Sequence, residues 1–191
     1  MENSLFVAFS TFAFVSLVTP GPNNLMLMAS GANFGFVRSA PHMLGVDLGF
    51  AFMVAMVGFG LAGILTAYPS LYSALKAVSL AYLLYLAWKI AGSAGIGEAR
   101  PGARPMTFFQ AAGFQWVNPK AWAMALTAVT VYAPDRNLAA VALISLVFFA
   151  IGLLTAGLWV VTGREVRRWL TDTRRLRAFN IAMASLLLAS L

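Results

Sequence analysis

Long apolar runs separated by short polar stretches dominate the chain. The hydrocarbon core of a bilayer is about 30 Å thick and needs roughly 20 apolar residues in a helix to cross it. Six segments meet or approach that length, so we expect six transmembrane helices. They cover Ser4–Ala32, Ser39–Thr66, Leu71–Ala91, Phe108–Val131, Leu138–Thr162 and Leu176–Leu191.

Proline interrupts two of these segments, about half a chain apart. The first interruption is Thr19-Pro20-Gly21-Pro22-Asn23-Asn24 and the second is Asn118-Pro119-Lys120. Proline has no N–H to donate and clashes with the preceding turn, so each helix should break or kink there. Backbone groups freed in hydrocarbon must be buried in protein or face a water-filled cavity. Paired interruptions of this kind point to the central binding site of a transporter.

A linker divides the chain into two groups of three segments. The stretch Gly92–Pro105 is rich in Gly, Ala and Pro, and it predicts a linker over residues 92–106. Because three is an odd number, half-repeat 107–191 enters the membrane from the side opposite to half-repeat 1–91. We therefore expect a single all-α transmembrane domain (1–191), built as a 3+3 inverted repeat with a broken first helix in each half.

The basic residues flank the apolar runs. The net charge is +7, and six of the thirteen Lys and Arg residues lie between Arg164 and Arg177. Arg38, Lys89, Arg100 and Arg104 lie in other stretches on the same side of the predicted topology. Positively charged loops stay in the cytoplasm, so both termini should face outward. This distribution argues against a nucleic-acid-binding face.

Composition excludes several classes of chemistry. The chain has no cysteine and one histidine, and 10% of its residues are charged. Disulfides and thiolate catalysis are therefore excluded, and we expect no metal site and no cofactor. An enzyme acting on lipid is a further alternative, but no nucleophile–base pair supports it. A non-catalytic membrane scaffold would not explain the paired breaks.

Small residues mark helix-packing faces. Gly45 and Gly49 form a GxxxG pair in the second segment, a pattern typical of close helix contacts in membranes. Such glycine-lined helices permit a homodimer without requiring one.

The first break has the features of a new helix start. Gly21 suits a cap, and Pro22 fits the first turn, where a missing N–H has no consequence. Asn23 and Asn24 would then place amide side chains beside the free N–H groups of that half-helix.

The second break repeats the pattern. Asn118 is a good N-cap and Pro119 again occupies the first helical position. Lys120 adds a positive charge one residue later. Each half thus offers a positive helix end suited to a carboxylate, while the carbonyl ends near Val18 and Val117 suit an ammonium group or another cation.

A zwitterionic amino acid carries both charges, so we hypothesise that the two breaks bind such a substrate. The alternative is that both prolines only kink tightly packed helices. A second alternative is an inorganic-ion carrier or channel that uses the same site. The candidate residues at the breaks are Pro20, Gly21, Pro22, Asn23, Asn24, Asn118, Pro119 and Lys120.

Asp47 lies within the second segment, between Val46 and Leu48. An ionisable group at such a position costs ~3 kcal/mol on insertion scales unless it is paired or hydrated. It is a candidate proton carrier, a candidate site for the substrate's ammonium group, or the partner of Lys120; the alternative is a structural or snorkelling acid.

His42 is closer to the loop and is interpreted as a helix-start residue. Gln115 is polar, but the pattern does not place it.

Three stretches together resemble the lysine exporter (LysE/RhtB-type) amino-acid exporters. They are Thr19-Pro20-Gly21-Pro22-Asn23 followed by Asn33-Phe34-Gly35, then Tyr82-Leu83-Leu84-Tyr85-Leu86-Ala87-Trp88-Lys89, and Phe114-Gln115-Trp116-Val117-Asn118-Pro119-Lys120-Ala121. The resemblance implies a six-helix inner-membrane carrier that exports amino acids, driven by the proton gradient or the membrane potential. It also places the Pro, Gly, Asn and Lys residues of both breaks at the family's motif positions.

One departure concerns the acid of the second helix. Some members carry an acid directly after a glycine, whereas here Gly49 is followed by Phe50 and Asp47 comes earlier. The resemblance does not identify the cargo, because basic, small polar and apolar amino acids all occur as cargos in the family.

Overall fold

The computed structural model describes residues 3–61, 63, 67–92, 104–135, 137–170 and 172–189. These residues form helices and no strands, which confirms the all-α expectation. The helices are α1 (Asn3–Val18), α2 (Pro22–Phe34), α3 (Phe36–Met56), η1 (Val57–Leu61), α5 (Pro69–Ala91), α6 (Phe108–Phe114), η2 (Gln115–Val117), α7 (Pro119–Tyr132), α8 (Leu138–Trp169) and α9 (Thr173–Ala189).

Two continuous helical stretches of the described chain are long and apolar enough to cross a membrane. They are Phe36–Leu61, which joins α3 to η1, and Leu138–Trp169, which is α8. The pair α1 and α2 qualifies as a third span if it is counted as one broken helix, with a bend of 54° between its parts. The remaining three spans and the 3+3 repeat stay predictions.

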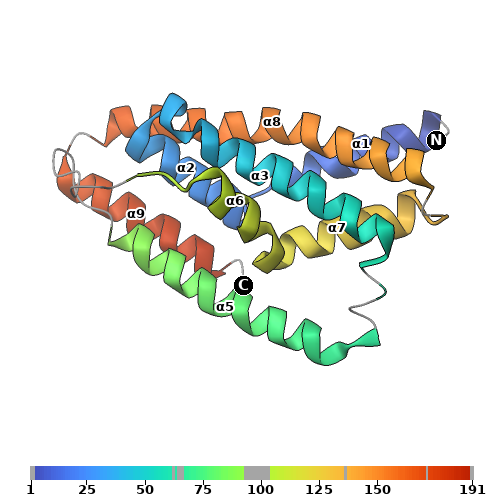
Figure 1. Cartoon of the computed structure of the whole chain (residues 1–191). Helices are drawn as coiled ribbons and strands as arrows, with labels where there is room; N and C mark the ends of the chain where they lie inside the picture. Colours follow the sequence, from blue (N-terminus) through green and yellow to red (C-terminus); the bar gives the residue numbers. More distant parts are fainter. Residues whose placement is uncertain are drawn as a thin grey trace.

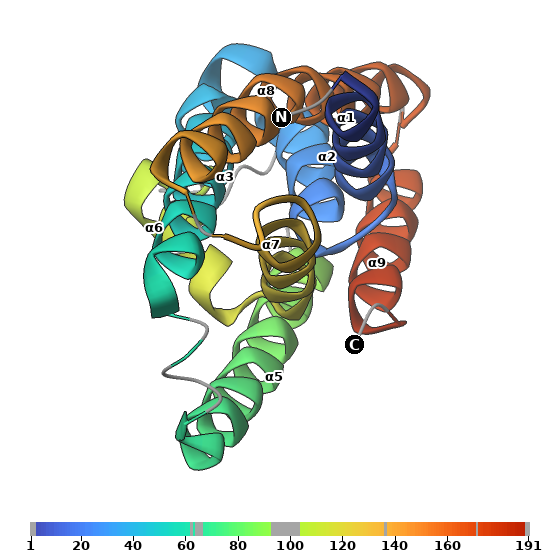
Figure 2. The same ribbon diagram turned by 90° about the vertical axis from the view of Figure 1, so that its right-hand side faces the viewer.

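The helices form a bundle in which the two halves of the chain interleave (Figure 1). Helix α8 lies along α1, α2 and α3, and α3 also packs on α6. Helices α5 and α9 lie side by side as a pair on the other side of the bundle, and α7 lies between the two groups (Figure 2). Both broken helices therefore meet in the middle of the bundle.

Separate apolar clusters pack on either side of the breaks. One joins α1, α3, α7 and α8, where Phe148 makes edge-on contacts with Phe9 and Phe50 at centroid distances of 5.1 and 5.0 Å. Another joins α2, α5, α6 and α9 around Phe114 and Leu83. The interrupted backbone thus lies between two well-packed regions that keep its position.

Glycines let four of the helices approach closely. A Cβ at Gly31 of α2 would collide with the backbone of Val160 in α8, and Gly163 meets the backbone of Met28 in the same way. Gly45 and Gly49 of α3 face the backbone of α6, which confirms the packing role predicted for the GxxxG pair. Without a hydrophobic force between helices in lipid, such contacts supply much of the attraction.

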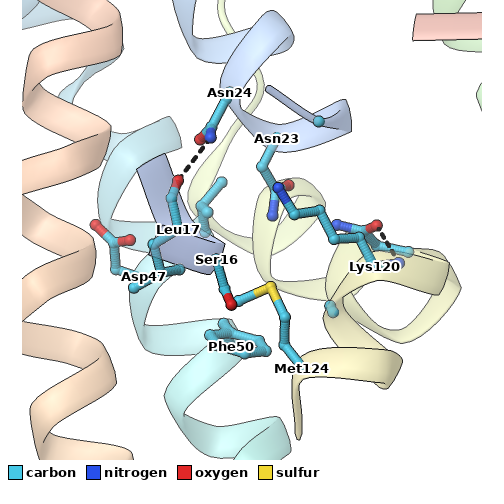
Figure 3. Close-up of a pocket in the computed structure, with 12 residues that line it drawn as sticks. Ser16, Leu17, Asn23, Asn24, Asp47, Phe50, Lys120 and Met124 are labelled. Carbon is cyan, nitrogen blue, oxygen red and sulfur yellow. Dashed lines mark hydrogen bonds between the residues drawn. The ribbon is translucent and has the colours of Figure 1, made fainter. Parts of the chain in front are cut away.

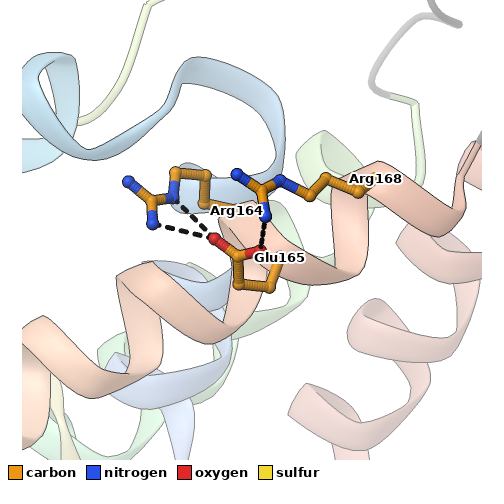
Figure 4. A network of polar contacts seen from close by, with 3 residues as sticks. All are labelled: Arg164, Glu165 and Arg168. Carbon is orange, nitrogen blue, oxygen red and sulfur yellow. Dashed lines mark hydrogen bonds and ion pairs between the residues drawn. The ribbon is translucent and has the colours of Figure 1, made fainter.

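The expectation that the cluster of basic residues between the last two segments lies in a loop is wrong. Helix α8 continues past Thr162 to Trp169, and α9 begins at Thr173. Hydropathy ends a segment where the side chains become polar, but the backbone hydrogen bonds of a helix continue beyond that point. The end of α8 is stabilised by Glu165, which pairs with Arg164 at 2.8 Å and with Arg168 (Figure 4).

The predicted linker 92–106 lies mostly outside the described residues. Its end is described, and there Thr107 begins α6 with a capping box: its hydroxyl accepts from the N–H of Gln110, and the Gln110 side chain accepts from the N–H of Thr107. Such a box satisfies two of the free donors of a helix start.

The contact between α2 and α8 gives a prediction. Gly31→Ala should separate the helices because the added methyl meets the Val160 carbonyl, and we expect a loss of about 1–3 kcal/mol of stability, typical of overpacking. The measurement is the thermal unfolding midpoint of the detergent-purified protein. Gly113→Ala is the matched control, since a Cβ there meets nothing within 4 Å; equal midpoints for the two variants would contradict the prediction.

Candidate functional site: a pocket between two helix breaks

The first break is an extended link between two helices. Helix α1 ends at Val18, and α2 begins at Pro22 with Gly21 as an extended N-cap (φ −179°, ψ 176°) that has no side-chain cap. Pro20 and Pro22 supply no N–H groups here, so the carbonyls at the end of α1 lack these helical donors. The Thr19 hydroxyl donates to one of them, the Ser16 carbonyl, at 3.0 Å. The predicted break, cap and first-turn proline are confirmed.

The second break is shorter. After α6 the chain tightens into the 3₁₀ turn η2, and Asn118 then interrupts the helix before Pro119 starts α7. The Asn118 side chain accepts from the N–H of Lys120 at 3.1 Å, as an N-cap does. The predicted roles of Asn118 and Pro119 are confirmed.

Lys120 joins the two breaks. Its Nζ donates to the Thr19 carbonyl and the Thr19 hydroxyl, each at 2.9 Å, and to the Pro20 carbonyl at 3.3 Å. Its side chain lies against Gly21, where a Cβ would be 2.9 Å from Cδ. The carbonyl end of α1, predicted to attract an ammonium group, thus receives one from the protein itself.

Asn23 joins the breaks a second time. Its Nδ2 donates to Gln115 Oε1 at 2.9 Å, and Gln115 Nε2 donates back to Asn23 Oδ1 at 3.2 Å. Gln115 is fully buried and also donates to the Ala111 carbonyl. The two amides satisfy each other, so they fix the relative position of α2 and η2.

The expectation that Asn24 lies beside the free N–H groups of α2 is wrong. Asn24 is buried and turns back to α1, where its Nδ2 donates to the carbonyls of Leu17 at 2.7 Å and Thr19 at 2.8 Å. The carbonyls freed at the end of α1 need donors, and an amide one turn into α2 reaches them.

Asp47 is buried, with 5% of its surface exposed, and its Oδ2 has no hydrogen-bond partner. Its carboxylate lies against Gly152 of α8, where a Cβ would be 2.7 Å from Oδ1. Among the described residues it belongs to no ion pair, so the pairing with Lys120 considered above is not formed. It is also too deeply buried to be a snorkelling acid.

These side chains surround one pocket (Figure 3). Asp47 and Lys120 lie on opposite sides of it, and Phe50 and Met124 line the wall near Ser16. The centre of a water molecule can occupy about 30 Å³, which is room for about one or two waters. The full lining is Ser16, Leu17, Gly21, Asn23, Asn24, Val46, Asp47, Phe50, Asn118, Lys120, Ala121 and Met124.

The structure brings six of the nine predicted residues to this pocket: Gly21, Asn23, Asn24, Asp47, Asn118 and Lys120. Pro20, Pro22 and Pro119 do not line it; they shape the backbone that does.

Sequence reasoning missed Thr19, Ser16 and Gly152 as contributors to the site. Thr19 was part of the quoted motif, and its hydroxyl beside a proline was a signal that went unused. Gly152 had no signal beyond helix packing, because only the fold shows that its missing side chain leaves room for Asp47.

The interpretation of His42 as a helix-start residue is also wrong. Helix α3 begins at Phe36, before the expected Ser39, and His42 lies two turns inside it with 2% of its surface exposed. Hydropathy placed the start too late because Arg38 belongs to the first turn of the helix.

Comparisons with known proteins agree with a transport role. The family model described as LysE type translocator matches residues 14–189. A cysteine/O-acetylserine efflux protein of Salmonella typhimurium (strain LT2) is 32% identical over 98% of this chain and 95% of its own length. The protein of the same description from Escherichia coli (strain K12) is 30% identical over 98% of this chain and 95% of its own length. No solved structure matches the chain significantly.

The reciprocal amide pair gives a prediction. Asn23→Ala and Gln115→Ala each remove both hydrogen bonds of the Asn23–Gln115 pair. The double variant should therefore lose less stability than the sum of the losses in the two single variants. We expect a coupling of about 1 kcal/mol, from roughly 0.6 kcal/mol per hydrogen bond in membrane proteins. Thermal or denaturant unfolding in detergent measures it.

The control cycle combines Asn23→Ala with Thr130→Ala, whose hydroxyl bonds only within α7 to the Leu126 carbonyl. That cycle should be additive, and an equally additive cycle for Asn23 and Gln115 would show that the pair does not join the breaks.

Proposed function

The chain belongs to the LysE type translocator family, and we propose that it exports a small neutral amino acid across a bacterial inner membrane. The family match confirms the resemblance seen in the sequence motifs and makes the chain a translocator rather than an enzyme. One observation carries the rest of the proposal: a pocket at the two breaks is lined by a carboxylate and an ammonium group that do not pair with each other.

The separation of these charges gives the cargo an orientation. The ammonium group of the cargo faces Asp47, whose Oδ2 has no other partner. The carboxylate of the cargo faces the positive charge of Lys120, whose three N–H donors are bound to Thr19 and Pro20. It also faces the start of α2, where the first-turn N–H groups and the helix dipole favour an anion. This reverses part of the hypothesis from sequence, in which backbone carbonyls received the ammonium group, because Lys120 and Asn24 bind those carbonyls.

The remaining wall supports a small, uncharged side chain. It is formed by Leu17, Phe50 and Met124, with the Ser16 hydroxyl among them. Once Asp47 and Lys120 have bound the two charges of the backbone, the lining contains no further acid for a lysine or arginine side chain. The names of the relatives, which concern cysteine and O-acetylserine, agree with this class, and we propose the same two compounds as first candidates.

Asp47 also supplies a means of coupling. A carboxylate in a pocket of this kind is costly when it is charged and alone. It therefore holds either the ammonium group of the cargo or a proton, and exchange of the two moves one proton inward for each cargo molecule that leaves. A zwitterion carries no net charge, so the membrane potential acts on this cycle only through the proton.

The pairing of helices supports the inverted repeat. The second helices of the two halves, α3 and α8, pack on each other, as do the third helices, α5 and α9. The contact of α3 with α6 has its counterpart in that of α8 with α1, and the two breaks face one another. We propose that the halves have opposite orientations and that both termini lie on the outer face, as the distribution of basic residues predicts.

The inorganic-ion alternative loses backbone ligands of the first break in this arrangement and keeps Asp47. The oxygens of Thr19 and Pro20 that could hold a cation bind Lys120. Within the described residues, no group of three or more His, Asp or Glu side chains could hold a metal. The amino-acid cargo therefore explains the site better.

Efflux from loaded proteoliposomes tests the cargo and the coupling. We expect O-acetyl-L-serine and L-cysteine to leave faster than L-lysine, because the pocket has no second acid. An acidic outer buffer, or a potential that is negative inside, should accelerate efflux because each turnover carries a proton inward. Fastest export of a basic amino acid, or efflux indifferent to both gradients, would contradict the proposal.

Variants of the pocket test the site. Asp47→Asn and Lys120→Ala should each weaken cargo binding by about 10- to 100-fold, because each removes one of the two charges that face the cargo and an interaction with a charged group is worth about 1.5–3 kcal/mol. Asn118→Ala should weaken binding as well, because it removes the cap that holds the backbone of Lys120 in place. Gly152→Ala should do the same by displacing the Asp47 carboxylate. Binding and efflux are measured with O-acetyl-L-serine.

Leu48→Ala is the matched control, because Leu48 follows Asp47 on α3 but is exposed on the outer face of the bundle. All variants should insert into the membrane in similar amounts. Normal transport by the three charge and cap variants would exclude this pocket as the site.

A further inference from the structure

A second pocket lies beside the first, and the two share no lining residue. The volume open to the centre of a water molecule is about 100 Å³ in this pocket and about 30 Å³ in the first pocket. It is formed by α2, α3, α5 and the residues before α6. Its lining is Met26, Ala29, Ser30, Asn33, Phe34, His42, Leu86, Ile90, Arg104, Pro105 and Met106.

His42 is the chain's one histidine and the most unusual group in this lining. It is 2% exposed, and neither Nδ1 nor Nε2 has a hydrogen-bond partner. Buried polar groups are almost always bonded, so each exception calls for an explanation. A neutral imidazole offers one N–H donor and one acceptor nitrogen, and both are available at this pocket.

The facing wall on α2 offers acceptors. Ser39 donates its hydroxyl proton to the Gly35 carbonyl at 2.8 Å, so Ser30 must be the donor in the 2.8 Å contact between the two serine oxygens. The lone pairs of Ser30 are then free to accept. Asn33 donates through Nδ2 to the Ala29 carbonyl, which leaves its Oδ1 as a further acceptor.

Arg104 adds a positive charge to the lining. The pocket therefore combines donors, from Arg104 and the His42 N–H, with acceptors from Ser30 and Asn33. This combination matches a carboxylate and an ammonium group on one small molecule, as the charges of the first pocket do.

The two pockets lie in series along the same two helices. On α2, Asn23 and Asn24 line the first pocket, and residues from Met26 onward line the second. On α3, His42 precedes Asp47 by five residues, a rise of about 7.5 Å along the helix. The second pocket lies toward the end of the bundle that carries Arg38 and the α8 arginines, which is the predicted cytoplasmic end.

We propose that the His42 pocket is a second binding site for the zwitterionic amino-acid cargo, occupied on the cytoplasmic side before the cargo reaches Asp47. This inference rests on the proposed function, since the ligand is the same cargo. The carboxylate of the cargo binds Arg104 and His42, and its ammonium group binds Ser30 and Asn33.

The natural lack of cysteine allows a direct test. Ile90→Cys places a single thiol on the α5 wall of the second pocket, at a partly exposed residue that makes none of the proposed bonds. The rate of its labelling by N-ethylmaleimide is measured with and without O-acetyl-L-serine, which has no thiol of its own. At a concentration ten times the dissociation constant, bound ligand should slow labelling about tenfold.

Two backgrounds make the result specific to this pocket. Protection should persist with Asp47→Asn, which disables the first pocket, and disappear with His42→Leu, which removes both ring nitrogens. If His42→Leu lowers the thermal midpoint, Ala29→Leu, which fills the pocket from α2, serves as the second variant. Val37→Cys, 84% exposed on α3 and outside both pockets, should label at one rate throughout.

Three outcomes would overturn the proposal. They are no protection of Ile90→Cys in a protein that still exports O-acetyl-L-serine, loss of protection with Asp47→Asn, and protection that survives both His42→Leu and Ala29→Leu. Each of these outcomes is compatible with the proposed function of the unmodified protein, whereas absence of any amino-acid efflux by that protein would instead contradict the proposed function.

Discussion

The ammonium group of Lys120 is bound by the oxygens that the first helix break exposes, and the site depends on this contact. Proline removes the N–H groups that would have satisfied the end of α1, and lipid offers no water to replace them. Lys120 comes from the other half of the chain and donates to Thr19 and Pro20. The same bonds satisfy carbonyls at the break, place the charge of a partly buried lysine against helix-end dipoles, and bring the two breaks to one pocket.

In this arrangement the two charged groups of the pocket differ in their hydrogen bonding. Lys120 has oxygen partners, whereas one oxygen of Asp47 has none. A buried carboxylate without a partner is strongly disfavoured, so the pocket favours either a proton or a bound ammonium group. In the proposed cycle, binding and coupling would follow from one cause, because the group that attracts the cargo is the group that must be neutralised when the cargo leaves. Gly152 matters to both, since its missing side chain leaves the room in which Asp47 lies.

Local chemistry made the breaks predictable, whereas the contacts across them depended on the fold. Gly21, Pro22, Asn118 and Pro119 act through their own backbone, so their roles as caps and helix starts could be read from the sequence. Asn24 and Lys120 were expected beside helix N-termini, but their side chains instead donate to carbonyls at the end of α1. These carbonyls lack helical donors, and this need decides where the two side chains point. Gln115 could not be placed from the sequence, since its partner Asn23 lies far away in the chain. His42 was expected at a helix start, but it lies inside α3. Hydropathy also ended the fifth segment at Thr162, where α8 continues.

The close glycine contacts restrict how cargo could pass from one pocket to the other. Gly31 and Gly163 hold α2 to α8, and Gly45 and Gly49 hold α3 to α6, all at backbone distance. Packed interfaces of this kind resist gradual deformation, so these four helices should move as one body. The second pocket is lined on another side by Leu86 and Ile90 of α5, and α5 packs chiefly on α9. The α5–α9 pair lies outside this group of four helices, so we propose that its movement changes access to His42 while leaving the bonds of Lys120 in place.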